Sequence, residues 1–96
     1  MNMNAIQSVR AVGNKSAHDT FTIVQRIIAE TTGNDMEDIT LDADFEDDLG
    51  IDMMHELPAI VMRIQKEIDV KLSMQAVKDC ATVAELVELI DDEREL

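Results

Sequence analysis

Apolar residues recur at helical spacing in four stretches of this chain, which predicts four helices. The first stretch begins near Phe21, where Asp19 or Thr20 can cap it, and ends at Gly33. The inward-facing positions of the four stretches are Val24, Ile27, Ile28 and Thr31; Leu57, Ile60, Val61, Ile64 and Ile68; Met74 and Val77; and Val83, Leu86, Val87 and Ile90. With one proline and three glycines in 96 residues, the pattern indicates an all-α domain.

The start of the second helix depends on Pro58. A helix capped by Asp52 would carry Pro58 in its interior, at a cost of roughly 3 kcal/mol. A start near His55 to Leu57 would place Pro58 in the first turn, where a missing backbone N–H is tolerated. We therefore expect this helix to begin late or to bulge.

Local signals define the last two helices. Ser73 can cap a short third helix that runs through Asp79, and Thr82 with Glu85 forms a capping box for the fourth. The acidic end at 91–93 opposes the helix dipole, so we expect it to fray.

A long acidic connection joins the first two helices. Its apolar residues are spaced as anchors over the core: Met36, Ile39, Leu41, Phe45 and Leu49. Its nine acids are Asp35, Glu37, Asp38, Asp42, Asp44, Glu46, Asp47, Asp48 and Asp52, and it has no base. A calcium-binding EF-hand fails, because Asp47 would replace the required glycine and Met53 the closing glutamate. We expect no specific metal site, although weak divalent binding stays open.

The net charge of −13, from 21 acidic and 8 basic side chains, disfavours nucleic acid and anionic membranes as partners. A protein with a basic or apolar surface is the expected partner. No apolar run approaches the roughly 18 residues of a membrane span. The single cysteine, Cys80, forms no intramolecular disulfide and is predicted to be a small buried hydrophobic residue. Since no secretory leader opens the chain, a cytoplasmic location is predicted.

Residues 1–17 are predicted to be a mobile extension, and residues 18–96 the folded domain. The extension ends in a turn-like Gly-Asn-Lys-Ser segment. A short docking helix remains an alternative, because Met3, Ile6, Val9 and Val12 recur at a spacing of three.

The segment from Phe45 through Asp48-Leu49-Gly50-Ile51-Asp52, followed by a helix, resembles the acyl carrier proteins. With the helical spacing, the resemblance covers about residues 18 to 91. It implies a four-helix bundle with a long acidic loop between helices one and two and a short third helix. It also implies a phosphopantetheine arm on a Ser directly after Asp52. The stretch between Met54 and Ile60 is one residue longer than in common carriers.

Met53 stands where the family places this Ser. A thioether offers no hydroxyl for a phosphodiester, so no phosphopantetheine and no other cofactor is expected. The resemblance then implies a degenerate member that acts as a docking, regulatory or structural subunit, with no enzyme activity. The alternative is a working acyl or peptidyl carrier of fatty acid, polyketide or related biosynthesis, with its arm elsewhere. The only serines are Ser8, Ser16 and Ser73.

Candidate partner-binding residues lie around the start of the second helix: Met53, Met54, Glu56 and Met62. Methionines adapt to varied partners, although they equally serve as gap-fillers in an aromatic-poor core. The family's second helix docks basic enzymes of acyl or peptidyl biosynthesis, but here Arg63 and Lys66 offset Glu56 and Glu67 and are expected to dilute that face. No catalytic residue is predicted; His55 has no adjacent nucleophile and is expected to be an exposed surface residue.

Overall fold

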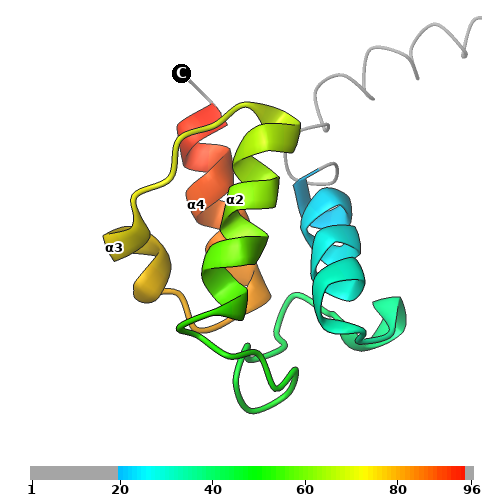
Figure 1. Ribbon diagram of the computed structural model, residues 1–96. Helices are drawn as coiled ribbons and strands as arrows, with labels where there is room; N and C mark the ends of the chain where they lie inside the picture. The colour runs from blue at the N-terminus through cyan, green and yellow to red at the C-terminus, as the bar shows by residue number, and fades with distance from the viewer. Residues whose placement is uncertain (1–19, 95–96) are drawn as a thin grey trace, which may run out of the picture.

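The structure is a computed structural model that describes residues 20–94. Its helices occupy residues 20–32, α2 Glu56–Ile68, α3 Met74–Lys78 and α4 Val83–Arg94, with a short 3-10 helix, η1, at Met36–Asp38 (Figure 1). Within this part of the chain the only bridge of β type is the isolated pair Asp44 and Thr82. The fold is thus the all-α, four-helix bundle that the sequence predicts. The proposed extension, residues 1–17, lies outside the described residues.

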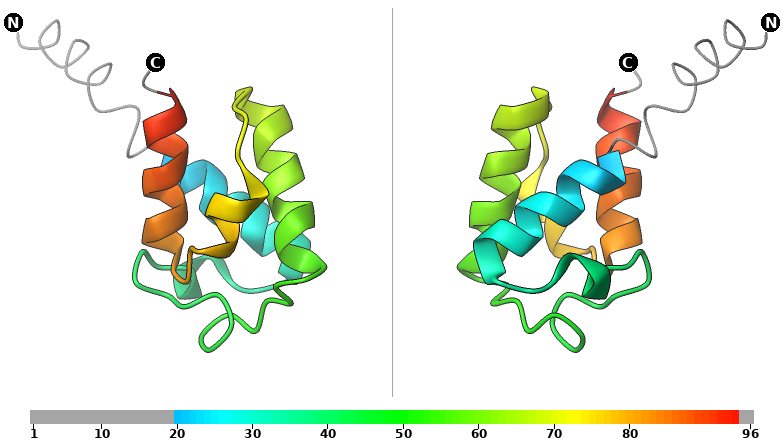
Figure 2. Two further views of the ribbon diagram at one scale, coloured as in Figure 1. Left: turned by 90° about the vertical axis from the view of Figure 1, so that its left-hand side faces the viewer. Right: turned by 90° about the vertical axis from the view of Figure 1, so that its right-hand side faces the viewer.

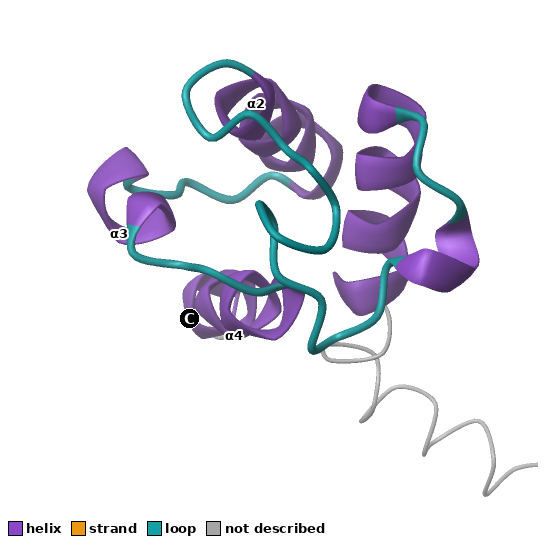
Figure 3. Ribbon diagram, turned by 90° about the horizontal axis from the view of Figure 1, so that it is seen from below, coloured by secondary structure: helices purple, strands orange, loops and turns teal. Residues whose placement is uncertain are grey.

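The four helices surround one core. α2 and α4 stand opposite each other, and the helix of residues 20–32 and α3 close the other two sides (Figure 2). The connection between the first helix and α2 crosses one end of the bundle, where α2 and α4 both begin (Figure 3). The start of α2 is therefore presented at the same end as the acidic loop.

The core contains the predicted aliphatic stripes and a single aromatic residue, Phe45. Its fully buried large side chains are Phe45, Ile27, Ile28, Ile39, Leu57, Ile60, Ile64, Leu86, Ile90, Val24, Val61 and Val77. Cys80 is buried, as predicted. Met74 was expected to face inward but is 38% exposed, and Val77 is the buried residue of α3.

Three of the five predicted loop anchors, Ile39, Phe45 and Leu49, are buried. The other two, Met36 and Leu41, are exposed, so that part of the prediction is wrong. Leu41 holds the loop through its carbonyl instead, which accepts a 2.8 Å hydrogen bond from the backbone N–H of Ala84. Backbone bonds of this kind carry no signature in the pattern of apolar residues.

Two further backbone bonds join the loop to the beginning of α4. Phe45 N–H donates to the Ala81 carbonyl at 2.9 Å, and Val83 N–H donates to the Ala43 carbonyl at 3.1 Å. These bonds fix the segment that precedes Asp52 against α4, and they satisfy backbone groups that burial of Phe45 would otherwise leave unpaired.

The predicted caps of the later helices are confirmed. Ser73 Oγ accepts a hydrogen bond from Ala76 N–H at 3.3 Å. Thr82 Oγ1 accepts from Glu85 N–H, and Glu85 Oε1 accepts in return from Thr82 N–H, both at 3.3 Å. This is the reciprocal geometry of a capping box.

We expected the acidic end of α4, residues 91–93, to fray, but the helix continues to Arg94. Thr20, the fully buried first described residue of the bundle, donates from Oγ1 to Asp91 Oδ1 at 2.6 Å. Arg94 donates to the same hydroxyl at 2.8 Å. The last turn is therefore held by tertiary bonds that offset the unfavourable position of its acids in the helix dipole.

Candidate functional site

Asp52 organises the entrance to α2. Its carboxylate oxygen Oδ1 accepts hydrogen bonds from the backbone N–H groups of Met54 at 2.8 Å and His55 at 3.2 Å. Its own backbone N–H donates to Glu56 Oε1 at 2.8 Å. The carboxylates of Asp52 and Glu56 thus accept backbone N–H groups within and just before the turn at 53–55. This is the reciprocal arrangement of a capping box, with one additional residue between the two acids.

The turn at 53–55 is wider than an ordinary first helical turn. The carbonyl of Asp52 accepts from Glu56 N–H at 2.8 Å and also from Leu57 N–H at 3.0 Å, five residues later. A five-residue separation is the spacing of a π-bulge, which accommodates one additional residue. α2 then begins at Glu56, so Pro58 falls in its first turn and the expected late start is confirmed.

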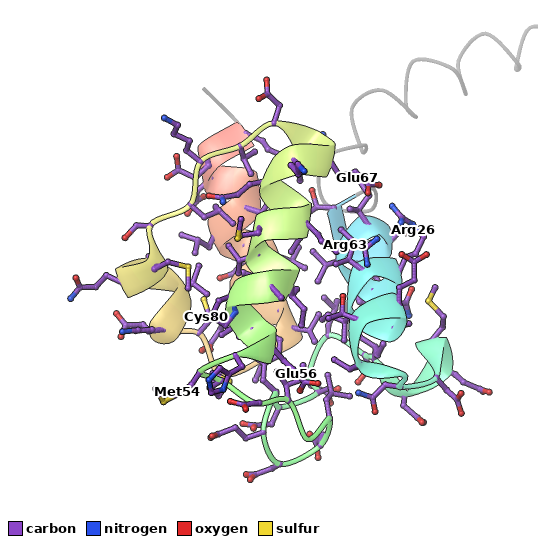
Figure 4. The ribbon with its side chains drawn as sticks, in the orientation of Figure 1. Arg26, Met54, Glu56, Arg63, Glu67 and Cys80 are labelled. Atoms are coloured by element: carbon purple, nitrogen blue, oxygen red, sulfur yellow. The ribbon has the colours of Figure 1, made fainter. Side chains whose placement is uncertain are left out.

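Met53 and Met54 lie beside α3. A cavity of about 360 Å³ between the start of α2 and α3 is lined by Met53, Met54, Leu57, Pro58, Met74 and Lys78. Met53 is half-buried, whereas Met54 is 78% exposed and lies at the foot of α2, on the side away from Arg63 (Figure 4). Met74 and Lys78 were missed from the sequence, because periodicity does not say which helices become neighbours.

Met62 does not join this cavity. It is 64% exposed and lines a second cavity of about 440 Å³, with Gln65, Lys66, Asp69, Val70, Lys71 and Leu72. The three candidate partner-binding methionines, Met53, Met54 and Met62, are therefore divided between two separate hollows along α2. Glu56, the fourth predicted partner-binding residue, is half-buried, and its carboxylate is occupied by the Asp52 backbone.

Arg63 and Glu67 do not belong to the face that carries these methionines. Arg63 donates to Glu30 Oε1 at 2.6 Å, and Arg26 pairs with both Glu30 and Glu67 (Figure 4). The hydrogen bond from Arg63 is the main cause that lowers the pKa of Glu30 below its usual 4.5. Arg63 is thus directed at the first helix, and the expected dilution of a docking face by its charge stays a prediction.

His55 is exposed, as predicted, with 82% of its side chain accessible. Its Nδ1 lies 3.1 Å from Asp52 Oδ2, and this hydrogen bond, more than that from Met54 N–H, lowers the pKa of Asp52 below 3.8. The thiol of Cys80 is no candidate nucleophile, since burial, with Glu85 and Asp79 nearby, raises its pKa above 9.0.

The described residues contain no group of three or more His, Cys, Asp or Glu side chains placed to hold a metal ion. Among the same residues, no helix has the length and apolar character required to cross a membrane. The side chains at the turn, Met53, Met54 and His55, carry no hydroxyl. They do not fit a phosphodiester-linked group, which needs an oxygen to attach to.

The chain is similar to known carrier proteins over most of its length. The family model described as "Phosphopantetheine attachment site" matches residues 22–90. An acyl carrier protein of Trieres chinensis is 33% identical over 75 residues, which cover 78% of this chain and 92% of the relative. Acyl carrier proteins of Exiguobacterium sp. and Exiguobacterium sibiricum are each 34% identical over 68 residues, covering 71% of this chain and 85% of each relative. The bundle, the loop and these similarities together show that the chain belongs to the acyl carrier protein family.

Proposed function

We propose that this protein is a carrier-fold subunit without a phosphopantetheine arm, and that it acts by protein contact as a docking, regulatory or structural component. One observation carries the proposal. The capped turn that follows Asp52 and leads into α2 presents Met53, Met54 and His55, none of which can form the phosphodiester. In this proposal the chain catalyses no reaction of its own.

The position of Ser73 adds support. Its Oγ caps α3 by accepting from Ala76 N–H, and no Asp precedes it in the sequence. Attaching a bulky group there would compete with the cap, which typically contributes about 1 kcal/mol. Ser8 and Ser16 lie outside the described residues.

The proposed partner is a protein with a basic or apolar surface, such as an enzyme of acyl or peptidyl biosynthesis, in the cytoplasm. The acidic connection between the first helix and α2 offers the basic part of such a surface a concentrated set of carboxylates. Met53, Met54 and Met62 offer apolar contacts, whereas Glu56 contributes chiefly by holding the turn.

Intact-mass measurement tests the proposal. The purified chain is incubated with coenzyme A and a phosphopantetheinyl transferase of broad specificity, with an ordinary acyl carrier protein as positive control. We expect the mass of this chain to stay unchanged while the control is fully modified. A gain of one phosphopantetheinyl group would overturn the proposal, and Ser→Ala variants at positions 8, 16 and 73 would then identify the site of a working carrier.

A further inference from the structure

The cations of α2, of α3 and of the connection between them fall into two sets. Arg63 faces the first helix and is paired with Glu30. Lys66, Lys71 and Lys78 line the two cavities on the other side of α2, and none of them makes an ion pair with any residue in the described part of the chain. Unpaired lysines are thus collected on one face.

The same face presents exposed thioethers. We name it the methionine–lysine face and define it by Met54, Met62, Met74, Lys66, Lys71 and Lys78. Exposed apolar groups that surround hollows and are bordered by charge are typical of sites for protein contact. Methionine suits such a site because its flexible, polarizable side chain adapts to a partner's shape.

The charge of this region differs from that of the rest of the chain. Residues 56–80 carry four acids, Glu56, Glu67, Asp69 and Asp79, and four bases, Arg63, Lys66, Lys71 and Lys78, and are therefore neutral in a chain of charge −13. Of the four acids, only Asp69 lines either cavity. An extended anionic surface would be repelled by the acidic loop as well, whereas a narrow acidic segment meets fewer of the loop carboxylates, and salt screens the more distant ones.

The separation of the two hollows along α2 determines which side chains of a docked helix could enter both. Leu57 and Pro58 line the first, and Met62, Gln65 and Lys66 line the second, so the midpoints of the two linings on α2 lie about seven residues apart. At 1.5 Å rise per residue this is on the order of 10 Å, or two helical turns. A helix laid along the face would place apolar side chains at positions i and i+7 into the two hollows, which is the usual pattern of helix-in-groove recognition.

We propose that the methionine–lysine face docks an amphipathic helix of a protein partner, with an apolar stripe that enters the two hollows and acidic residues that meet Lys66, Lys71 and Lys78. The inference rests on the proposed function, because it identifies the chemistry of the partner that such a subunit would contact. It also changes the charge expected of the partner: the partner surface that meets the methionines is acidic, and any basic surface would bind at the acidic loop.

The test uses the full chain and a synthetic helical peptide with leucines at i, i+4 and i+7 and glutamates beside them, followed by fluorescence anisotropy. A second peptide has the same composition in scrambled order. We expect the patterned peptide to bind and the scrambled one to bind at least about tenfold more weakly. Vesicles of equal parts phosphatidylglycerol and phosphatidylcholine should not bind.

A matched pair of variants locates the contact. Lys78→Glu changes the net charge by −2 on the face, and Met36→Glu with Leu41→Glu changes it by the same −2 on exposed loop positions. Lys78→Glu should weaken peptide binding about tenfold and the loop variant less than about twofold. Lys78→Gln gives a milder change should Lys78→Glu fail to fold.

Equal effects of the charge-matched variants, equal binding of the two peptides, or binding of vesicles in place of the peptide would each overturn the docking proposal. Peptide binding is measured on protein of unmodified mass. A failure of the docking proposal is therefore distinguishable from a failure of the proposed function, which is detected as a gain in mass.

Discussion

The guanidinium of Arg63 lies 2.6 Å from Glu30 Oε1, across the interface between α2 and the helix of residues 20–32. Glu30 also pairs with Arg26 at 3.6 Å, and Arg26 with Glu67, so that charges of alternating sign join the two helices. All four side chains are partly exposed, and such surface pairs individually add little stability. The pairs mark the face of α2 that is turned to the first helix, and the methionines and lysines lie on another face.

The Glu30 contact predicts how stability depends on pH. The pKa of Glu30 is lowered below 4.5 and that of Asp52 below 3.8, so the stability these groups contribute is present above those values and is lost as pH falls through their lower, folded-state pKa values. From pH 7 to about 5 the melting temperature should instead rise, as protonation begins to relieve repulsion in a chain of charge −13.

Thermal melts followed by circular dichroism across this range check the prediction. Glu30→Gln should flatten the acid limb below about pH 4.5. Glu88→Gln, at an exposed position of α4, serves as control and should leave that limb in place. A melting temperature that climbs continuously down to pH 3 would show that the interhelix pairs contribute nothing.

The acidic loop predicts a second dependence, on salt. Asp44 and Asp48 are engaged, since Asp44 Oδ1 accepts from the backbone N–H groups of Glu46 and Asp47 at 2.9 Å, and Asp48 Oδ2 accepts from Asp44 N–H at 2.7 Å. Glu46 and Asp47 themselves are exposed. We expect the melting temperature to rise with sodium chloride and with millimolar magnesium or calcium, because ions screen the nine acids.

Two variants separate repulsion from capping in that loop. Glu46→Gln with Asp47→Asn should raise the melting temperature at low salt and reduce the salt effect, because the double variant removes charge without removing a side-chain cap. Asp44→Ala should lower the melting temperature by removing the acceptor of two backbone N–H groups. If both variants respond to salt as the parent does, the loop acids are not the source of the repulsion.

Local sequence signals predicted the helices and their caps better than they predicted which residues are exposed. The Ser73 cap, the Thr82–Glu85 capping box and the late start of α2, which places Pro58 in its first turn, depend on residues close in sequence. All three are confirmed. The loop anchors were only partly correct, because irregular backbone has no periodicity and Leu41 is held by its carbonyl.

The pairing of distant residues could not be predicted in the same way. Arg63 with Glu30 and Met74 with Met53 are set by the rotation of one helix against another, which depends on the packing of the whole core. Charge counts along α2 alone therefore could not show that Arg63 pairs with the first helix. The candidate site was recognised through the family resemblance at Asp52 and Met53, but its lysines required the structure.

The contact between the first and last described helices, at Thr20, predicts a stability effect. Thr20 is fully buried, and its hydroxyl donates to Asp91 and accepts from Arg94. Thr20→Val keeps the shape and removes both bonds, so the free energy of unfolding should fall by about 1 to 3 kcal/mol. Thr40→Val, on the exposed loop, should change it by less than about 0.5 kcal/mol. Urea titration measures both, and equal small losses would mean that Asp91 and Arg94 are satisfied by solvent.

The widened turn predicts that restoring a serine is not enough to restore a carrier. Met53→Ser supplies a hydroxyl directly after Asp52, but the turn that holds it is closed by the bond from Leu57 N–H to the Asp52 carbonyl, and α2 starts only at Glu56. A misplacement of about 1 Å in a reacting group can cost on the order of a hundredfold in rate. We expect Met53→Ser to be modified by a phosphopantetheinyl transferase at least about tenfold more slowly than an ordinary acyl carrier protein.

Variants that change the charge of α2 test whether slow modification comes from a misplaced hydroxyl or from weak docking of the transferase. Lys66→Glu, added to Met53→Ser, places an acid on the exposed face without touching the Arg63–Glu30 pair, and should speed modification if docking to a basic transferase is limiting. Arg63→Glu, added instead, should destabilise the bundle and bring no gain, since it sets two acids against each other between the helices. Intact mass is followed over time, with circular dichroism as the control for folding. A single Met53→Ser chain that is modified as fast as an ordinary carrier would show that the extra residue in the turn is no obstacle, and that Met53 alone separates this protein from a working carrier.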